Sequence, residues 1–261
     1  MTDAHNHLHQ LPDPAKALAE ATNHGVTHML VNGTSEADWA NVEQLAQQHP
    51  EVLSSFGLHP WHVPERSANW LELLRHFLTK NPNATIGECG LDRWKKPYDL
   101  ADQLQCLQAQ LDLANELKRP LTIHCLQAWG PLLELLQKQA CLPPFLLHAY
   151  SGSTELVSSF TKLGAYFSFN GYFLHERKAA VRKTFQHIPL DRLLLESDAP
   201  AMLPPTSHQA IPLPNKQNHP ANLAQFIAPF SQILAVAPDK LATNLEENFQ
   251  KWMAAPPQPA L

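Results

Sequence analysis

The sequence has no excess of basic residues and no long apolar run, and both absences limit what the protein can do. Its 261 residues include 19 Lys and Arg against 24 Asp and Glu, which gives a formal net charge of −5. We therefore expect no broad cationic surface for nucleic acid, so nucleic acid would have to be handled at a small site or through a metal. No stretch approaches the ~20 apolar residues of a membrane helix, and we expect no membrane partner.

Cysteine is scarce, and its spacing is uninformative. The chain has four cysteines and no Cys-x-x-Cys pair, so it carries neither a disulfide framework nor a cysteine metal motif. The first residues show neither the basic stretch nor the apolar stretch of a secretory signal. We expect a soluble protein of a reducing compartment, the cytoplasm.

The length and the apolar content of 44% suit one large α/β domain or two small ones. No change in composition favours two, so we expect a single domain over residues 1–254. Proline is dense in two places, 200–220 and 256–259. The first is expected to be a long loop that could contact a protein partner, and residues 255–261 are expected to form a disordered tail.

Apolar runs of strand length alternate with amphipathic stretches along the whole chain. After the opening stretch, strands are predicted over 26–31, 52–56, 84–87, 120–123, 145–147, 165–169 and 192–196. Helices are predicted over 14–22, 35–48, 70–80, 103–117, 128–139, 154–163, 176–187, 221–235 and 239–253, with Ser35 as an N-cap. Eight such strands separated by helices predict a closed (β/α)8 TIM barrel, and an open parallel sheet is the alternative.

The opening stretch contains a His-x-His pair. Side chains alternate faces in an extended segment, so His5 and His7 point the same way, with Asp3 and His9 on that side. These residues could meet one divalent ion. In a chain with 15 histidines such a pair is also expected about once by chance, so further ligands must come from elsewhere.

Side chains that can bind metal recur where the predicted strands end. A parallel barrel brings these ends to one face, which is where active sites of this fold lie. Imidazole and carboxylate ligands suit Zn²⁺ or Mn²⁺, and this many groups can hold two ions bridged by a carboxylate. Any one histidine could instead be structural, and Cys89 and Cys125 should point away from the site. The candidate residues are His5, His7, His59, Glu88, His124, His148 and Asp198.

A series of short motifs resembles, in order and over nearly the whole chain, the motifs of the TatD family of metal-dependent deoxyribonucleases. Each motif is weak alone, but the ordered set is specific. The motifs are Asp3-Ala4-His5-Asn6-His7-Leu8, Gly57-Leu58-His59-Pro60, Gly87-Glu88-Cys89-Gly90-Leu91-Asp92, Ile123-His124, His148-Ala149-Tyr150-Ser151-Gly152, Glu196-Ser197-Asp198-Ala199-Pro200, Asn218-His219-Pro220-Ala221-Asn222-Leu223 and Asn248.

The resemblance implies a TIM-barrel phosphodiesterase with two divalent ions, Zn²⁺, Mg²⁺ or Mn²⁺, acting on single-stranded DNA or another phosphodiester. Activated water would attack the phosphodiester, and Asp198 would accept its proton. Glu88 and Asp198 are thus the expected catalytic residues. The implied ligands are His5, His7 and Asp198 for one ion, His124 and His148 for the other, and Glu88 as the bridge.

Other residues are expected to support the metals or to hold substrate. Glu196 faces the same way as Asp198 and could support a ligand or act directly, and Asp3 is expected to support its strand. The candidates for binding phosphate or base are His59, Trp61, Arg93, Ser151 and Asn170.

The chain departs from the family pattern at two positions. The family usually places an Arg two or three residues after His124, where this chain has Leu126 and Gln127, and Gln217 stands where an Arg customarily precedes Asn218. Two cations that would face phosphate are therefore missing. We expect weakened DNA affinity or a smaller phosphorylated substrate.

Two alternative functions stay open. An amidohydrolase-type barrel acting on an ester, lactone or amide shares the His-x-His pair and a late Asp. Many two-metal members of that group bridge their metals with a modified Lys where this chain has Glu88, which favours phosphoester chemistry. The other alternative is a metal-binding barrel with weak or no activity that serves as a subunit of a larger assembly.

Overall fold

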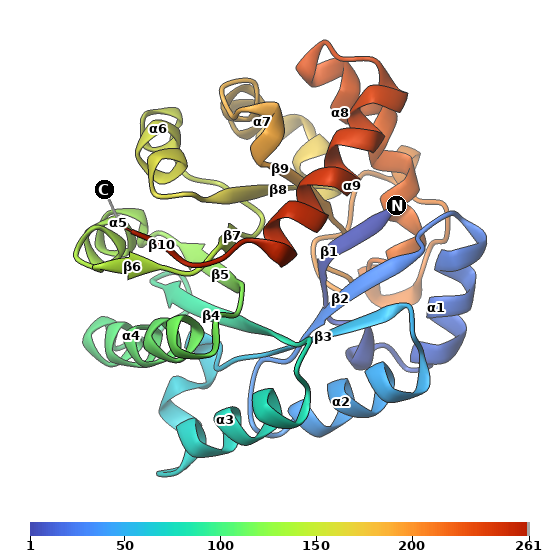
Figure 1. Cartoon of the computed structure of the whole chain (residues 1–261). Helices are drawn as coiled ribbons and strands as arrows, with labels where there is room; N and C mark the ends of the chain where they lie inside the picture. Colours follow the sequence, from blue (N-terminus) through green and yellow to red (C-terminus); the bar gives the residue numbers. More distant parts are fainter. Residues whose placement is uncertain (260–261) are drawn as a thin grey trace.

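Eight parallel strands form an inner ring, and helices surround them (Figure 1). The computed structural model describes residues 1–259. Each strand pairs in parallel with the next along the chain, which confirms the predicted TIM barrel. The strands are β1 (Thr2–Asn6), β2 (His28–Asn32), β3 (Val52–Phe56), β4 (Thr85–Asp92), β5 (Leu121–Leu126), β7 (Phe145–Leu147), β8 (Tyr166–Asn170) and β9 (Leu193–Glu196).

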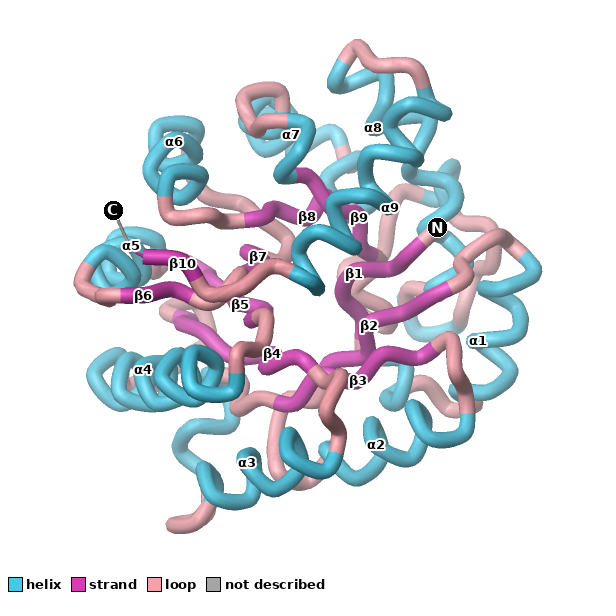
Figure 2. Tube along the Cα trace, viewed as in Figure 1, coloured by secondary structure: helices cyan, strands magenta, loops and turns pink. Residues whose placement is uncertain are grey.

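The helices lie outside the strands on all sides (Figure 2). Because helices cover the outer face and side chains fill the interior, the strands are apolar and almost entirely buried. The α-helices are α1 (Pro14–Asn23), α2 (Trp39–Gln48), α3 (Trp70–Lys80), α4 (Leu100–Leu117), α5 (Trp129–Gln137), α6 (Thr154–Lys162), α7 (Ala179–Phe185), α8 (Ile227–Leu234) and α9 (Pro238–Ala254). Among residues 1–259, no helix has both the length and the apolar content that crossing a membrane requires.

The barrel closes between its first strand and the segment that follows its last. The amide of Asp198 donates to the carbonyl of His5 at 3.0 Å, and the amide of His7 donates to the carbonyl of Ala199 at 2.7 Å. The same segment is tied to β1 by Asp3, whose carboxylate accepts the amide of Ser197 at 2.9 Å. Residues nearly two hundred positions apart in the sequence are thereby joined at one end of the barrel.

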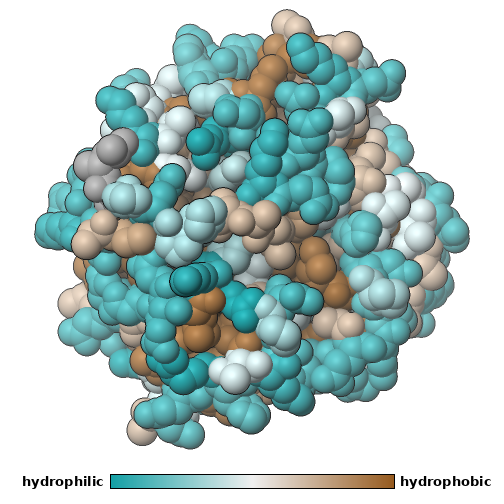
Figure 3. All heavy atoms as spheres, viewed as in Figure 1, coloured by the Kyte–Doolittle hydropathy of each residue, from teal (hydrophilic) through white to brown (hydrophobic). Residues whose placement is uncertain are grey.

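The helix α9 closes the opposite end of the barrel. Leu146 and Leu194 lie two residues before His148 and Glu196 on their strands, so they share the inward face but sit nearer the strand starts. They pack in one cluster with Phe249 and Trp252 of α9, and Trp252 is fully buried. Figure 1 shows α9 crossing in front of the strands, and side chains fill this end of the barrel in the space-filling view (Figure 3). Access to the interior is therefore from the carboxyl ends of the strands.

Two strands continue past their predicted ends. The prediction ended one strand at Glu88 and another at His124, whereas β4 runs to Asp92 and β5 runs to Leu126. Gly90 interrupts the strand pattern in the sequence, because glycine is unfavourable inside a strand, so the prediction ended this strand too early. Gly90 is required here, since its φ is 141° and a Cβ would lie 1.9 Å from the carbonyl oxygen of His124. Glu88 and His124 thus stand within paired strands rather than beyond them.

Three helices begin at least three residues later than predicted, whereas α4 begins three residues earlier, at Leu100. Ser35 does not begin α2; the carboxylate of Asp38 accepts the amides of Thr34 and Ser35, which holds a turn before the helix starts at Trp39. The stretches 176–187 and 221–235 each begin with a 3-10 turn, so α7 and α8 are shorter than predicted.

The proline-rich segments are both ordered within the described residues. In the tail, β10 (Gln258–Pro259) pairs antiparallel with β6 (Cys141–Leu142), so the expectation of disorder is wrong there. The expectation for residues 260 and 261 lies outside the described part of the chain. The 200–220 segment is fixed by Asn222, whose side-chain oxygen accepts the amides of Ala210 and Ile211. Its predicted contact with a protein partner stays a prediction.

Candidate metal centre

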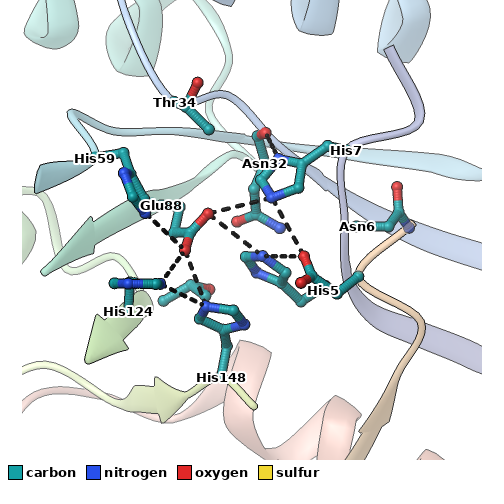
Figure 4. Close-up of polar contacts among 12 residues, drawn as sticks. His5, Asn6, His7, Asn32, Thr34, His59, Glu88, His124 and His148 are labelled. Carbon is teal, nitrogen blue, oxygen red and sulfur yellow. Dashed lines mark hydrogen bonds and ion pairs between the residues drawn. The ribbon is translucent and has the colours of Figure 1, made fainter. Parts of the chain in front are cut away.

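Glu88 lies at the middle of a cluster of histidines at the carboxyl end of the barrel (Figure 4). The histidines divide between its two carboxylate oxygens. Oε2 lies 3.2 Å from Nε2 of His7 and 3.5 Å from Nε2 of His5, whereas Oε1 lies 2.9 Å from Nε2 of His148, 3.0 Å from Nδ1 of His124 and 3.4 Å from Nε2 of His59. Side chains from β1, β4, β5 and the ends of β3 and β7 thus meet at one carboxylate.

Asp198 completes the cluster on the side of β1. Its Oδ1 lies 3.5 Å from Nε2 of His5 and 3.4 Å from Nε2 of His7. Three overlapping groups within the described residues offer ligand atoms within 4.8 Å of one another: His5 with His7 and Asp198, His5 with Glu88 and His148, and His59 with Glu88 and His124.

The ring of His5 tests whether a metal fits this cluster. It is fully buried, yet neither ring nitrogen has a hydrogen-bond partner among the described residues. A buried polar atom without a partner costs about 1–3 kcal/mol. A cation coordinated by Nε2 would supply that partner. The donor set of imidazoles and carboxylates also suits Zn²⁺ or Mn²⁺.

Two of the histidines are oriented by acceptors on the far side of their rings. Nδ1 of His7 lies 2.8 Å from the carbonyl oxygen of Asn32, and Nδ1 of His148 lies 3.4 Å from Oε1 of Glu196. An acceptor at Nδ1 favours the tautomer with its proton there, which leaves Nε2 free to bind metal. Glu196 thus contacts the ring of His148 on the side away from Glu88, and its role as support for a ligand stays a prediction.

Asp92 orients His124 in the same way, and sequence reasoning gave it no role. Its Oδ2 lies 2.9 Å from Nε2 of His124 and accepts the indole N–H of Trp61 at 2.8 Å. Burial would raise the pKa of Asp92, but its hydrogen bonds with His124, the amide of Lys95 and Trp61, together with the charge of His124, lower it to about 2. One signal could have found this residue: Asp92 follows Glu88 by four positions, an even spacing that places both on one face of an extended strand.

Asp3 joins β1 to the segment that follows β9. Its carboxylate accepts the amide and the hydroxyl of Ser197 at 2.9 and 2.5 Å and the side-chain amide of Asn6 at 3.1 Å. Burial raises the pKa of Asp3 to about 7. These hydrogen bonds join β1 to the segment that carries Asp198.

The buried carboxylates and imidazoles of the cluster shift one another's pKa values. Burial would raise the pKa of Glu88, but the surrounding imidazoles, His59 first, hold it well below its ordinary value. Burial would lower the pKa of His7, but hydrogen bonds to Asp198 and Glu88 raise it to about 10. Burial lowers the pKa of His59 to about 4. Glu88 is therefore ionised at neutral pH and available as an anionic ligand.

A cavity of about 830 Å³ opens above the cluster, within the range of about 300–1,000 Å³ usual for ligand pockets. Three of the five predicted substrate residues line it: His59, Trp61 and Ser151. Arg93 is outside the lining and its Nε lies 3.4 Å from the hydroxyl of Tyr98. Asn170 is buried below, where its side-chain amide donates to Glu196 and to the carbonyl of Ser197.

The cavity wall also includes the segment where an Arg was expected. Gln127 and Cys125 both line the cavity. Cys89 is turned away from the cluster, with Sγ 3.5 Å from the carbonyl oxygen of Thr122, and Cys125 packs in the buried apolar core. Strand alternation ends with β5 at Leu126, and the positive φ of Gln127, 56°, turns the chain beside the opening.

A parallel eight-stranded barrel with a carboxylate set among histidines at the carboxyl ends of its strands defines a metal-dependent TIM-barrel hydrolase. The family model described as "TatD related DNase" matches residues 2–254, and the chain belongs to this family. The expectation of a TatD-type hydrolase of phosphodiester bonds is confirmed at this level.

Relatives and solved structures agree with the family assignment. The chain is 31% identical over 243 residues, 92% of each chain, to the "3'-5' ssDNA/RNA exonuclease TatD" of Pantoea ananatis, and 29% identical over 247 residues to the protein of the same name from Erwinia billingiae, 94% of each. A TatD homologue from Escherichia coli K12 has a similar crystal structure, with a TM-score of 0.89, 27% identity and 98% of each chain covered. A TatD family hydrolase from Entamoeba histolytica shares the fold, with a TM-score of 0.84, 17% identity and 97% of each chain covered.

Proposed function

We propose that the protein is an exonuclease that removes nucleotides from the 3′ end of single-stranded DNA or RNA with the help of two divalent metal ions. Its similarity to two relatives named as 3'-5' exonucleases, over more than nine-tenths of the chain, supports this activity. Zn²⁺, Mg²⁺ and Mn²⁺ are all compatible with the donor set.

The division of histidines between the two oxygens of Glu88 carries the proposal of two ions. One oxygen faces His5 and His7, and the other faces His124 and His148. A carboxylate placed in this way can bridge two cations about 3.5–4 Å apart. The ligands that we assign are His5, His7 and Asp198 on one side, His124 and His148 on the other, and Glu88 between them, with His59 next to the second group.

Divalent ions at such a site supply Lewis acidity toward water and toward the oxygens of a phosphodiester. Asp198 lies beside His5 and His7 and borders the cavity, so its carboxylate is placed to accept the proton of the attacking water. The carboxylates of Asp92 and Glu196 orient the rings of His124 and His148, and neither residue lines the cavity.

Replacement of Glu88 tests the proposal. Glu88→Ala should abolish the release of nucleotides from a 3′-labelled single strand and lower the bound metal measured by elemental analysis, while the circular dichroism spectrum stays that of the folded protein. Glu134→Ala, which removes an exposed carboxylate on α5, is the matched control and should change neither quantity. Full activity in Glu88→Ala would refute the assigned centre, and wild-type protein loaded with each metal that cuts no strand would refute the exonuclease.

A further inference from the structure

The most exposed large apolar side chains gather at one rim of the cavity. Within residues 1–259 these are Trp61, Trp94 and Tyr98, with exposed fractions of 37%, 60% and 36%. Single exposed apolar residues are ordinary, but a group of them beside a pocket marks a binding surface. Both tryptophans line the cavity that also contains Glu88. We call Trp61 and the segment 93–98 the aromatic ledge.

The rings of the ledge are arranged as a stacking surface. The rings of Trp61 and Trp94 lie with centroids 6.5 Å apart and planes inclined by 30°. Nζ of Lys95 lies 4.5 Å from the centroid of Trp61. Trp61 also lies next to the metal centre, since its centroid is 6.3 Å from that of His124.

The ledge is held in place by Asp92. Its Oδ1 accepts the amides of Trp94 and Lys95 at 2.6 and 2.9 Å, while its Oδ2 accepts the indole N–H of Trp61 at 2.8 Å. The same carboxylate that orients His124 therefore fixes the position of the exposed rings. A preorganised surface loses little conformational entropy when a ligand binds.

The charge of the ledge is opposite to that of the whole protein. Residues 93–98 include Arg93, Lys95 and Lys96 and no acid, in a chain with a net charge of −5. Flat aromatic faces beside cations match a nucleobase with its phosphate, and such surfaces bind unpaired bases without sequence preference. The ledge also supplies cations in a protein that lacks the expected arginines after His124 and before Asn218.

We propose that the aromatic ledge stacks an unpaired base of the nucleotide next to the phosphodiester in the metal centre. The inference rests on the proposed exonuclease and makes it more specific: the ledge selects single strands because bases within a duplex already stack on their neighbours and cannot turn a face to the ledge. The occupant is a nucleotide rather than a protein, because the rings border the reaction cavity and stand among cations.

Trp94 is the residue to test, because it is the most exposed of the three rings and lines the cavity. Trp94→Ala should raise the KM for a single-stranded oligonucleotide about tenfold, with little change in kcat, because stacking is lost. Trp94→Phe keeps an aromatic face and should restore most of the affinity. Cleavage of an oligonucleotide with an abasic site next to the scissile bond should be unaffected by Trp94→Ala, since no base is present to stack.

The same oligonucleotides distinguish failure of the ledge from failure of the exonuclease. Equal effects of Trp94→Ala on the normal and the abasic strand, or no effect on either, would overturn the ledge as a base subsite. A second measurement uses fluorescence anisotropy with a labelled phosphorothioate strand, which reports binding without cleavage. Weaker binding of this strand by Trp94→Ala supports the ledge even if the wild type cuts nothing, a result that would overturn only the exonuclease.

Discussion

Nε2 of His124 lies 2.9 Å from Oδ2 of Asp92, so the ring presents Nδ1, and not Nε2, to Glu88. His5, His7 and His148 present Nε2 instead. The difference follows from the strand pairing, because Gly90 of β4 pairs with His124 of β5 and Asp92 lies one step further along the same face. One carboxylate therefore fixes both the ring of His124 and the exposed tryptophans.

Replacing Asp92 by Asn should weaken metal binding while preserving the fold. The amide of Asn keeps the size of the side chain. It lacks the negative charge with which Asp92 orients His124 and makes the His124 ring more basic. Loss of such a supporting carboxylate typically costs 10–100-fold in metal affinity. Competition with a chelator, followed by elemental analysis, measures this change.

Asp239→Asn provides the control, because Asp239 is exposed at the start of α9 and distant from the cluster in sequence. It should leave metal affinity unchanged. If Asp92→Asn bound metal as tightly as the wild type, the contact with His124 would have no part in holding the ion.

The barrel and the clustering of the candidate ligands could be predicted from the sequence because both depend on local patterns. Apolar runs marked the strands, and polar residues such as Glu88 and Asp198 interrupted them near the end that faces the cavity. Placement of those residues required only that parallel strand ends converge. The family motifs then added the expected role of each residue.

The role of Asp92 and the start of α2 could not be predicted because both depend on contacts between segments. Gly90 interrupts the apolar pattern of β4, and its fit against His124 exists only in the paired sheet. Asp38 looks like an ordinary helical residue until its carboxylate accepts the amides of Thr34 and Ser35. Arg93 was one of five candidates for binding phosphate or base, and the structure places it outside the cavity lining, beside Tyr98.

The ion pair between Glu43 and Lys80 predicts a pH dependence of stability away from the metal centre. Burial would raise the pKa of Glu43, but Lys80 at 2.6 Å and the amide of Asn81 at 2.7 Å lower it below its ordinary value. A carboxyl whose pKa is lowered on folding stabilises the folded state above its ordinary pKa of about 4.3 and loses that contribution as the pH falls through the folded pKa.

We therefore expect Glu43→Gln to be less stable than the wild type at pH 7, by up to about 1 kcal/mol since Lys80 is half exposed. The difference in free energy of unfolding, measured with urea, should shrink as the pH falls below about 4. Metal-free protein is used for both variants so that ligand protonation affects them equally. A difference that stays constant from pH 7 to pH 3 would contradict a lowered pKa for Glu43.

The salt dependence of strand binding measures how many Lys and Arg side chains contact the phosphates of the substrate. Lys178 is the only Lys or Arg among the described residues that line the cavity, and the aromatic ledge adds Arg93, Lys95 and Lys96. Each phosphate neutralised on a single strand contributes about −0.7 to the slope of log K against log salt. We expect a total slope between about −1 and −3 for a phosphorothioate strand.

The variant Lys178→Ala should make this slope shallower by about 0.7. The control variant Lys162→Ala, which replaces an exposed lysine of α6, should leave the slope unchanged. A much steeper wild-type slope would mean that the strand crosses further basic side chains outside the cavity and the ledge.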